Sequence, residues 1–198
     1  MLVIFLDISV QSEFLYRIIL IFNSDCFGSS FIIFEFGGLS MKEVLDLYDN
    51  NFHKLNKTII RRVDKIPSDS NIMMSYALIR NDDKYLLEQA TERNDFKLAI
   101  PGGHVLTNEN GEQGLRRELR EELGIENANF KFIDTIKFPY NNYIFNIYLM
   151  EDKIDISELT LQSEEVLQVK WYSKTEILKL IKEDKIPRGY AYILEKYM

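Results

Sequence analysis

The chain has 198 residues, of which 46% are apolar, enough to bury the core of one domain of ordinary size. Its 31 acidic and 24 basic residues give a formal net charge of −7, which argues against non-specific binding to a nucleic acid backbone, because such binding normally needs a basic face. Cys26 is the only cysteine, so the sequence excludes a disulfide framework and a thiolate metal cluster, and it fits a reducing, cytosolic setting.

The first 36 residues are unusually apolar but match neither a secretory signal nor a membrane helix. Asp7 comes early, and Gln11-Ser12-Glu13 interrupts the apolar run. The stretch from Phe14 to Phe22 contains Arg17 and is far shorter than the ~20 residues that a membrane helix needs. We interpret residues 1–40 as a dispensable extension, with a membrane-surface or partner-binding segment as the alternative.

A second hypothesis for this extension concerns translation. Gly37-Gly38 can be encoded by a purine-rich run shortly before the codon of Met41, and such a run resembles a ribosome-binding site. This hypothesis predicts a native start at Met41 and a domain over residues 41–198. Peptides from residues 1–36 in protein expressed from the native gene would contradict it.

The segment from 41 to 90 reads as strands separated by turns. Strands are predicted over 43–49 and 57–64, with the turn signal Asn50-Asn51 between them. Ile72 to Arg80 is a near-continuous apolar run and is predicted to be a central buried strand, which forms a hairpin with 84–90.

The polar loop 91–97 comes just before a Pro-Gly-Gly turn, whose glycines permit backbone conformations denied to other residues. Arg93 and Lys97 are candidates to bind an anionic substrate, and solvated loop charges are the alternative interpretation. Phe96 is a candidate to stack on a base, and packing beneath the loop is the alternative.

The next element is an acidic helix predicted over 113–123. Its leucines recur every fourth residue and form an apolar ridge, and Gly124 supplies the left-handed position that ends the helix. Beside this ridge lie Glu118, Glu121 and Glu122, which repel one another by roughly 0.2–0.5 kcal/mol per exposed pair. A surface helix neutralised by its arginines is one interpretation. A site for Mg²⁺, which takes oxygen ligands and can activate water, is the other.

Residues 103–125 resemble the Nudix box, G-x5-E-x7-R-E-U-x-E-E-x-G-U, in which U is a bulky aliphatic residue. All of its specified positions match: Gly103, Glu109, Arg117-Glu118-Leu119, Glu121-Glu122, Gly124 and Ile125. The flanks extend the resemblance to about residues 43–182. The stretch 43–51, followed by an Arg-containing strand, is similar to a subgroup related to isopentenyl diphosphate isomerase.

The resemblance implies an α/β fold, the Nudix α/β/α sandwich around a mixed β-sheet, and hydrolysis of a diphosphate with Mg²⁺ or Mn²⁺. By position, Glu118, Glu121 and Glu122 are the implied metal ligands, and Arg117 orients them through an ion pair.

The remaining box positions are implied to shape the loop before the helix. Glu109 would brace this loop or bind a further ion, and Gly103 would let its backbone turn close to the metals. Asn108 stands where many members have glycine and is expected to adopt the same positive φ. The box leaves the general base open.

Beyond the box, strands are predicted over 130–134, 135–138 and 143–150. Relatives that hydrolyse ADP-ribose often have a proline after the box, and those acting on diadenosine polyphosphates often have a tyrosine slightly later. The chain has both Pro139 and Tyr143, so Tyr143 is a substrate-binding candidate and the substrate stays open.

The last part of the chain adds a catalytic candidate and a helix. In the family an acidic residue of a late loop often reaches the metals; Glu164 is the first candidate here and Glu165 the second. Ser173 and Glu176 form a predicted capping box that opens a helix, with Ile177, Leu178, Leu180 and Ile181 expected to be buried.

These observations predict a cytoplasmic, Mg²⁺-dependent pyrophosphohydrolase that cleaves a nucleoside diphosphate derivative or a related organic diphosphate. Its partner is a small-molecule diphosphate rather than nucleic acid or membrane, and a homodimer is compatible with the sequence. An isomerase of the isopentenyl diphosphate type is disfavoured, because that chemistry needs a cysteine near the substrate and Cys26 lies outside the domain. A non-catalytic Nudix-fold nucleotide-binding module or regulator is the alternative, although such proteins usually lose box glutamates.

Overall fold

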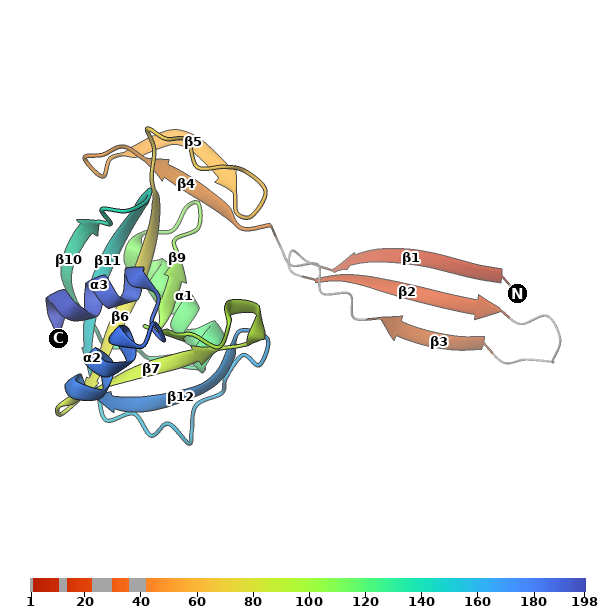
Figure 1. Cartoon of the computed structure of the whole chain (residues 1–198). Coiled ribbons are helices and arrows are strands. Elements are labelled where there is room, and N and C mark those ends of the chain that lie inside the picture. The colour runs from red at the N-terminus through yellow and green to blue at the C-terminus, as the bar shows by residue number, and fades with distance from the viewer. Residues whose placement is uncertain (1, 11–13, 23–29, 36–41) are drawn as a thin grey trace. The chain divides into compact units, whose positions relative to one another are not determined.

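The computed structural model describes residues 2–10, 14–22, 30–35 and 42–198, and it divides the chain into two compact units, Met1–Lys42 and Glu43–Met198 (Figure 1). The features that the sequence suggested at Gln11-Ser12-Glu13, Cys26, Gly37-Gly38 and Met41 lie outside the described residues.

The first unit is a three-stranded antiparallel sheet in the order β1 (Leu2–Val10), β2 (Phe14–Phe22), β3 (Ser30–Glu35). Isoleucine, leucine, valine and phenylalanine dominate all three strands, and β-branched and aromatic residues favour extended backbone. The register places Asp7 opposite Arg17, and Arg17 opposite Glu35. A charged position therefore recurs across the apolar strands.

The second unit is built on a mixed seven-stranded sheet. Across the sheet lie β10 (Lys131–Lys137), β11 (Tyr143–Glu151), β6 (Ile72–Asn81), β7 (Lys84–Ala90) and β12 (Val166–Ser173), with the short strands β8 (Leu98–Ala99) on β7 and β9 (Gly102–His104) on β6. The pair β6–β11 is parallel and the other pairs are antiparallel.

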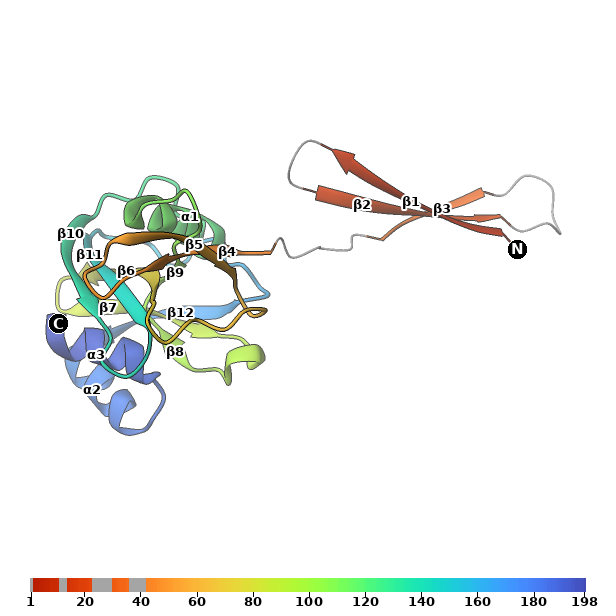
Figure 2. The same cartoon turned by 90° about the horizontal axis from the view of Figure 1, so that it is seen from above.

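Helices cover both faces of this sheet (Figure 2). On one face, α1 (Gly111–Leu123) buries its leucine ridge against residues such as Ala77 and Leu86. On the other face, α2 (Lys174–Lys182) and α3 (Arg188–Tyr197) pack in a core with Leu78 and Leu87. Alternate residues of the central strands thus enter two different cores, and the predicted α/β/α sandwich is confirmed.

A two-stranded hairpin, β4 (Val44–Tyr48) with β5 (Lys54–Ile60), adds a third small core. Leu45, Leu47 and Ile59 pack there with Ile72 at the start of β6. A bridge from Leu45 to Leu106 joins the hairpin to the loop that leads into α1.

The structure also differs from the sequence-based expectations in places. The strands predicted over 130–134 and 135–138 are the single strand β10, whose register shifts between Phe132 and Asp134. Leu178, expected to be buried in α2, is 37% exposed, because it points away from the core that Ile177 enters. Within the part of the chain that the structure describes, no helix combines the length and apolar character needed to cross a bilayer.

Candidate active site

Both ends of α1 are fixed by the sequence. At its start, the Asn110 side chain accepts a hydrogen bond from the Gln113 backbone N–H (2.9 Å), and the Gln113 side chain accepts one from the Asn110 backbone N–H (2.8 Å). At its end, Gly124 takes the left-handed conformation with φ of 71°. With Leu115, Leu119 and Leu123 buried, these ends set which side of the helix its glutamates occupy.

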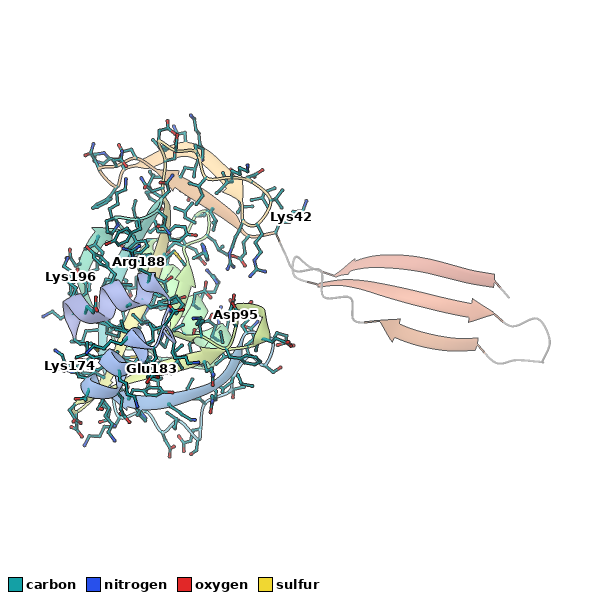
Figure 3. The ribbon with its side chains drawn as sticks, in the orientation of Figure 1. Lys42, Asp95, Lys174, Glu183, Arg188 and Lys196 are labelled. Carbon is teal, nitrogen blue, oxygen red and sulfur yellow. The ribbon has the colours of Figure 1, made fainter. Side chains whose placement is uncertain are left out.

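A cleft of about 600 Å³ lies beside α1. Four glutamates from three elements line it: Glu118 and Glu122 of α1, Glu88 of β7, and Glu165 from the loop before β12. The sheet edge at Gly102 and Gly103 closes another side. Asp95, labelled in Figure 3, is also part of the cleft lining.

These glutamates lie in one another's electrostatic field; Glu88 and Glu122 are buried, and Glu118 and Glu165 are half-buried. Glu88 is 7% exposed and Glu122 is 8% exposed. Burial, reinforced by Glu118 and Glu165, raises the pKa of Glu88 to about 8. Burial also raises the pKa of Glu118 to about 7, although Arg117 opposes the shift, and it raises the pKa of Glu122.

These residues fit a hard divalent cation by their donor chemistry. The Oε2 atoms of Glu88 and Glu122 are buried, and neither has a hydrogen-bond partner within the described residues. Magnesium takes such carboxylate oxygens as ligands, and a cation would offset the cost of burying them together. As the side chains stand, no group of three or more His, Cys, Asp or Glu residues in the described part of the chain is arranged to hold a metal ion.

Arg117 braces the acidic side of the helix. Its Nε lies 2.8 Å from Glu109 Oε1, its Nη1 lies 3.1 Å from Glu118 Oε1, and its Nη2 donates to the His104 carbonyl at 2.8 Å. Glu109 also accepts a hydrogen bond from the Leu106 backbone N–H at 2.9 Å. Arg117 thus connects the loop that precedes α1 to the helix itself, and it contacts the carboxylate of Glu118.

Two backbone features give the loop its shape. Gly103 faces Glu118 so closely that a Cβ atom at residue 103 would lie 2.5 Å from Glu118 Oε1. Asn108 has φ of 67°, the positive value expected for the position where many Nudix members have glycine.

Two predicted metal ligands stand apart from the cleft. The side chain of Glu121 is 46% exposed and contacts Arg117 at 3.2 Å. Glu109 is likewise engaged by Arg117 rather than lining the cleft. In the late acidic loop, the second candidate, Glu165, lines the cleft, whereas the first candidate, Glu164, accepts a hydrogen bond from the Ser163 hydroxyl.

The predicted substrate-binding residues are dispersed. Lys97 lines the cleft and pairs with Asp184 at 2.9 Å, whereas Phe96 is 49% exposed and lies outside the cleft lining. Arg93 belongs to the short 3-10 helix η1 (Glu92–Asn94), and its side chain lies outside what the structure describes.

Tyr143 lines a second cavity of about 290 Å³. Its walls are mainly aromatic, with Tyr76, Phe138 and Phe145 among them, and Arg188, labelled in Figure 3, is part of its lining. Met74, Pro187 and Tyr190 line both this cavity and the acidic cleft, so the two are adjacent.

Glu88 and Tyr190 were not among the residues that the sequence suggested. The available signal for Glu88 was a carboxylate inside the otherwise apolar part of the strand KYLLEQA. Tyr190 lies on α3, a helix that the sequence did not predict, so no pattern pointed to it.

Comparison with known proteins gives a consistent result. The family model described as NUDIX domain matches residues 74–196, more than half of the chain. The NAD-capped RNA hydrolase NudC of Escherichia coli (strain SMS-3-5 / SECEC) is 30% identical over 94 residues. That match covers 48% of this chain and only 36% of the NudC sequence.

Solved structures share the fold. DR0079 from Deinococcus radiodurans superposes with a TM-score of 0.68 at 17% identity, over 79% of this chain and 100% of that one. A MutT protein from Methanosarcina mazei Go1 gives a TM-score of 0.52 at 25% identity, over 67% of this chain and 94% of that one.

Proposed function

This chain belongs to the Nudix hydrolase family, and from that premise we propose that it is a Mg²⁺-dependent pyrophosphohydrolase of a nucleoside diphosphate derivative or related organic diphosphate. The observation that carries the proposal is the cleft beside the Nudix-box helix, whose lining includes two carboxylates with a buried, unpartnered oxygen, Glu122 of this helix and Glu88 of β7. The residues that would hold the cation are Glu118 and Glu122, with Glu165 in the role that the sequence suggested for Glu164. A bound cation would supply charge neutralisation of the diphosphate and activation of a water.

The chain's own residues would then position the reaction. Arg117 fixes the orientation of Glu118 through its contacts with Glu109 and the His104 carbonyl. Lys97 at the cleft lining would bind a phosphate oxygen once it leaves Asp184. Ordered carboxylates and cations around one cleft favour a transition state in which charge develops on phosphate oxygens.

The aromatic cavity supports a substrate that carries a planar organic group. A group seated near Tyr143 would be directly beside the acidic cleft, because Met74, Pro187 and Tyr190 line both spaces. NudC acts on NAD-capped RNA, which carries such groups on a diphosphate, and its 30% identity makes this a second candidate substrate. The net charge of −7 favours a small molecule over the RNA body.

The direct test is hydrolysis of a panel with Mg²⁺: ADP-ribose, NAD, diadenosine polyphosphates and NAD-capped RNA. Glu122→Gln and Glu165→Gln are expected to lower turnover by about 10²-fold or more, since each removes a charge from the cleft. Glu164→Gln, one residue from Glu165 but outside the cleft lining, is the matched control and should stay near wild type.

Three outcomes separate the alternatives. Metal-dependent turnover that survives Glu122→Gln would refute the site. Loss with Glu164→Gln but not Glu165→Gln would restore the assignment made from sequence. No turnover of any compound would favour the non-catalytic binding module.

The binding site of the substrate's planar group is tested by comparing the KM values of Tyr143→Ala and Phe96→Ala. Stacking of a base on an aromatic ring is worth about 1–3 kcal/mol, so Tyr143→Ala should raise KM by about 5-fold or more. Phe96, exposed on its loop, should leave KM unchanged. The reverse pattern would move the organic group to the loop 91–97.

A further inference from the structure

Glu88 lies on an interior strand, outside the Nudix box. In β7, Tyr85 and Leu87 enter the core beneath α2 and α3, while Leu86 enters the core beneath α1. Because side chains alternate along a strand, Glu88 projects to the same face as Leu86, toward α1. It sits opposite Ala99 of β8 and Val169 of β12, so strands flank it on both sides.

A carboxylate in this position needs a compensating partner. Glu88 is only 7% exposed, and burying an ionised carboxylate is costly unless it is paired. None of the ion pairs found among the described side chains involves Glu88, and its Oε2 has no hydrogen-bond partner there. The charged groups that face it from α1 and from the loop before β12 are Glu118, Glu122 and Glu165, which are also acidic.

Glu88 shares a cleft with the glutamates of the box helix. Glu88 and Glu122 line the same cleft, and each directs a buried oxygen without a partner among the described residues. Gly102 and Gly103 of β9 line it too, so no side chain from β9 fills the space at these two positions. Two carboxylates from two different elements, which line one cleft and each carry a buried, unpartnered oxygen, are the arrangement expected around a shared cation.

We propose that Glu88 is a ligand of the divalent cation held by Glu118 and Glu122, and that it anchors this cation to the sheet. The inference rests on the proposed function, because it takes the cation site of α1 as given. Glu118 and Glu122 fix the ion relative to their helix, and Glu165 would hold it from a loop. A carboxylate from β7 fixes it relative to the sheet, which also carries the aromatic cavity, and so sets the diphosphate against the organic group.

The competing interpretation is that Glu88 is a neutral, purely structural acid. Under it, the isosteric change Glu88→Gln would leave cation affinity unaltered. Under our proposal, the same change removes one charged ligand from the cation.

The experiment measures Mn²⁺ binding to the metal-free full chain by titration calorimetry and by the electron paramagnetic resonance signal of free Mn²⁺. Glu88→Gln is expected to weaken Mn²⁺ binding by about 10–100-fold, and Glu88→Asp, which retains a shorter carboxylate, by less. Glu164→Gln is the control and should bind as wild type does. The thermal midpoint is read with and without Mn²⁺: the metal-induced rise should shrink in Glu88→Gln, while the metal-free midpoint should equal or exceed that of wild type.

Affinity within about twofold of wild type for both Glu88 variants would overturn the inference. Glu122→Gln in the same titration distinguishes this failure from failure of the proposed function. If Glu122→Gln loses Mn²⁺ and the Glu88 variants do not, only the role of Glu88 is wrong. If Glu122→Gln also binds normally, the cation site on α1 is wrong and the inference falls with it.

Discussion

At the scale of single residues, the contact between Gly103 and Glu118 separates activity from stability. A Cβ at residue 103 would lie 2.5 Å from Glu118 Oε1, so Gly103→Ala must displace that carboxylate. The displaced atom is the end of a flexible side chain, so the fold should survive. We expect kcat/KM to fall by about 10–100-fold with a nearly unchanged thermal midpoint, since small misplacements of catalytic groups have effects of that size.

Gly124→Ala provides the opposite pattern. Its φ of 71° strains any residue with a Cβ, so the free energy of unfolding should fall by about 1–3 kcal/mol while the folded fraction keeps its activity. For the first variant, full activity in Gly103→Ala would show that turnover does not depend on the position of the Glu118 carboxylate.

The imidazole of His104 is expected to make the stability of the fold depend on pH. Burial, reinforced by Arg61, Arg62 and Arg117, lowers the pKa of this imidazole to about 3, whereas the unfolded value is near 6.5. The neutral ring therefore contributes stability that is complete above pH 6.5 and is lost as the pH falls, because only the unfolded chain takes up the proton.

Below pH 6.5, the free energy of unfolding of wild type should therefore decrease relative to that of His104→Gln, by up to about 1.4 kcal/mol per pH unit. Urea unfolding of both proteins at about pH 7.5 and about pH 5 measures it. A difference that does not change with pH would show that His104 titrates normally in the folded state.

The sequence could predict the box residues because their spacing encodes a helix face. Glu118 and Glu122 are one turn apart, and Leu119 and Leu123, each directly after one of them, show which side is buried. Glu165 could not be told from Glu164, since adjacent loop residues have no periodicity and only the backbone path decides which of them faces the cleft. Glu88 could not be predicted for another reason: its proposed role depends on α1, which packs on β6 and β9, bringing Glu118 and Glu122 to the cleft that Glu88 also lines, although these segments are far apart in the chain.

At the scale of elements, the hydrogen bonds at the start of α1 are expected to contribute to the free energy of unfolding. The reciprocal hydrogen bonds of Asn110 and Gln113 satisfy two backbone N–H groups that the first turn leaves free. Asn110→Ala is expected to lower the free energy of unfolding by about 0.5–2 kcal/mol, and Asn110→Gly by only a few tenths. Chemical denaturation measures both. Equal losses in the two variants would show that the cap hydrogen bond is not what stabilises this end.

Elements were predictable where local pattern and packing agree. Strand β6 has a long apolar run and is buried between two neighbours, and α2 has both its capping box and its apolar face. The sequence predicted two strands where the structure has the single strand β10. The register of β10 shifts between Phe132 and Asp134, which interrupts the alternation of its side chains. The helix α3 was not predicted because its N-cap residue, Pro187, makes no side-chain cap hydrogen bond, and because it packs in a core with strands more than a hundred residues earlier as well as with β11.

At the scale of the whole molecule, the two units predict the effect of a truncation. Residues 43–198 contain the three cores, the cleft and the aromatic cavity. A variant that begins at Met41 should therefore unfold at the same temperature as the second unit of the full chain, within about 2 °C, and keep its turnover. Calorimetry and hydrolysis assays of both forms measure this. A marked loss of either property would show that residues 1–40 support the domain.

The parallel pairing of β6 with β11 has a consequence for the order in which the domain folds. These strands join residues 72–80 to residues 143–151, and the Nudix box lies in the crossover between them. Contacts of such long sequence separation form slowly, because the entropy of closing the intervening chain is lost before they are made. During synthesis, a nascent chain that has emerged only as far as Ile125 already contains Glu118 and Glu122 of the cleft but no partner for this edge of β6. The catalytic centre is therefore completed late in folding, and metal ions should speed the final stage rather than the first.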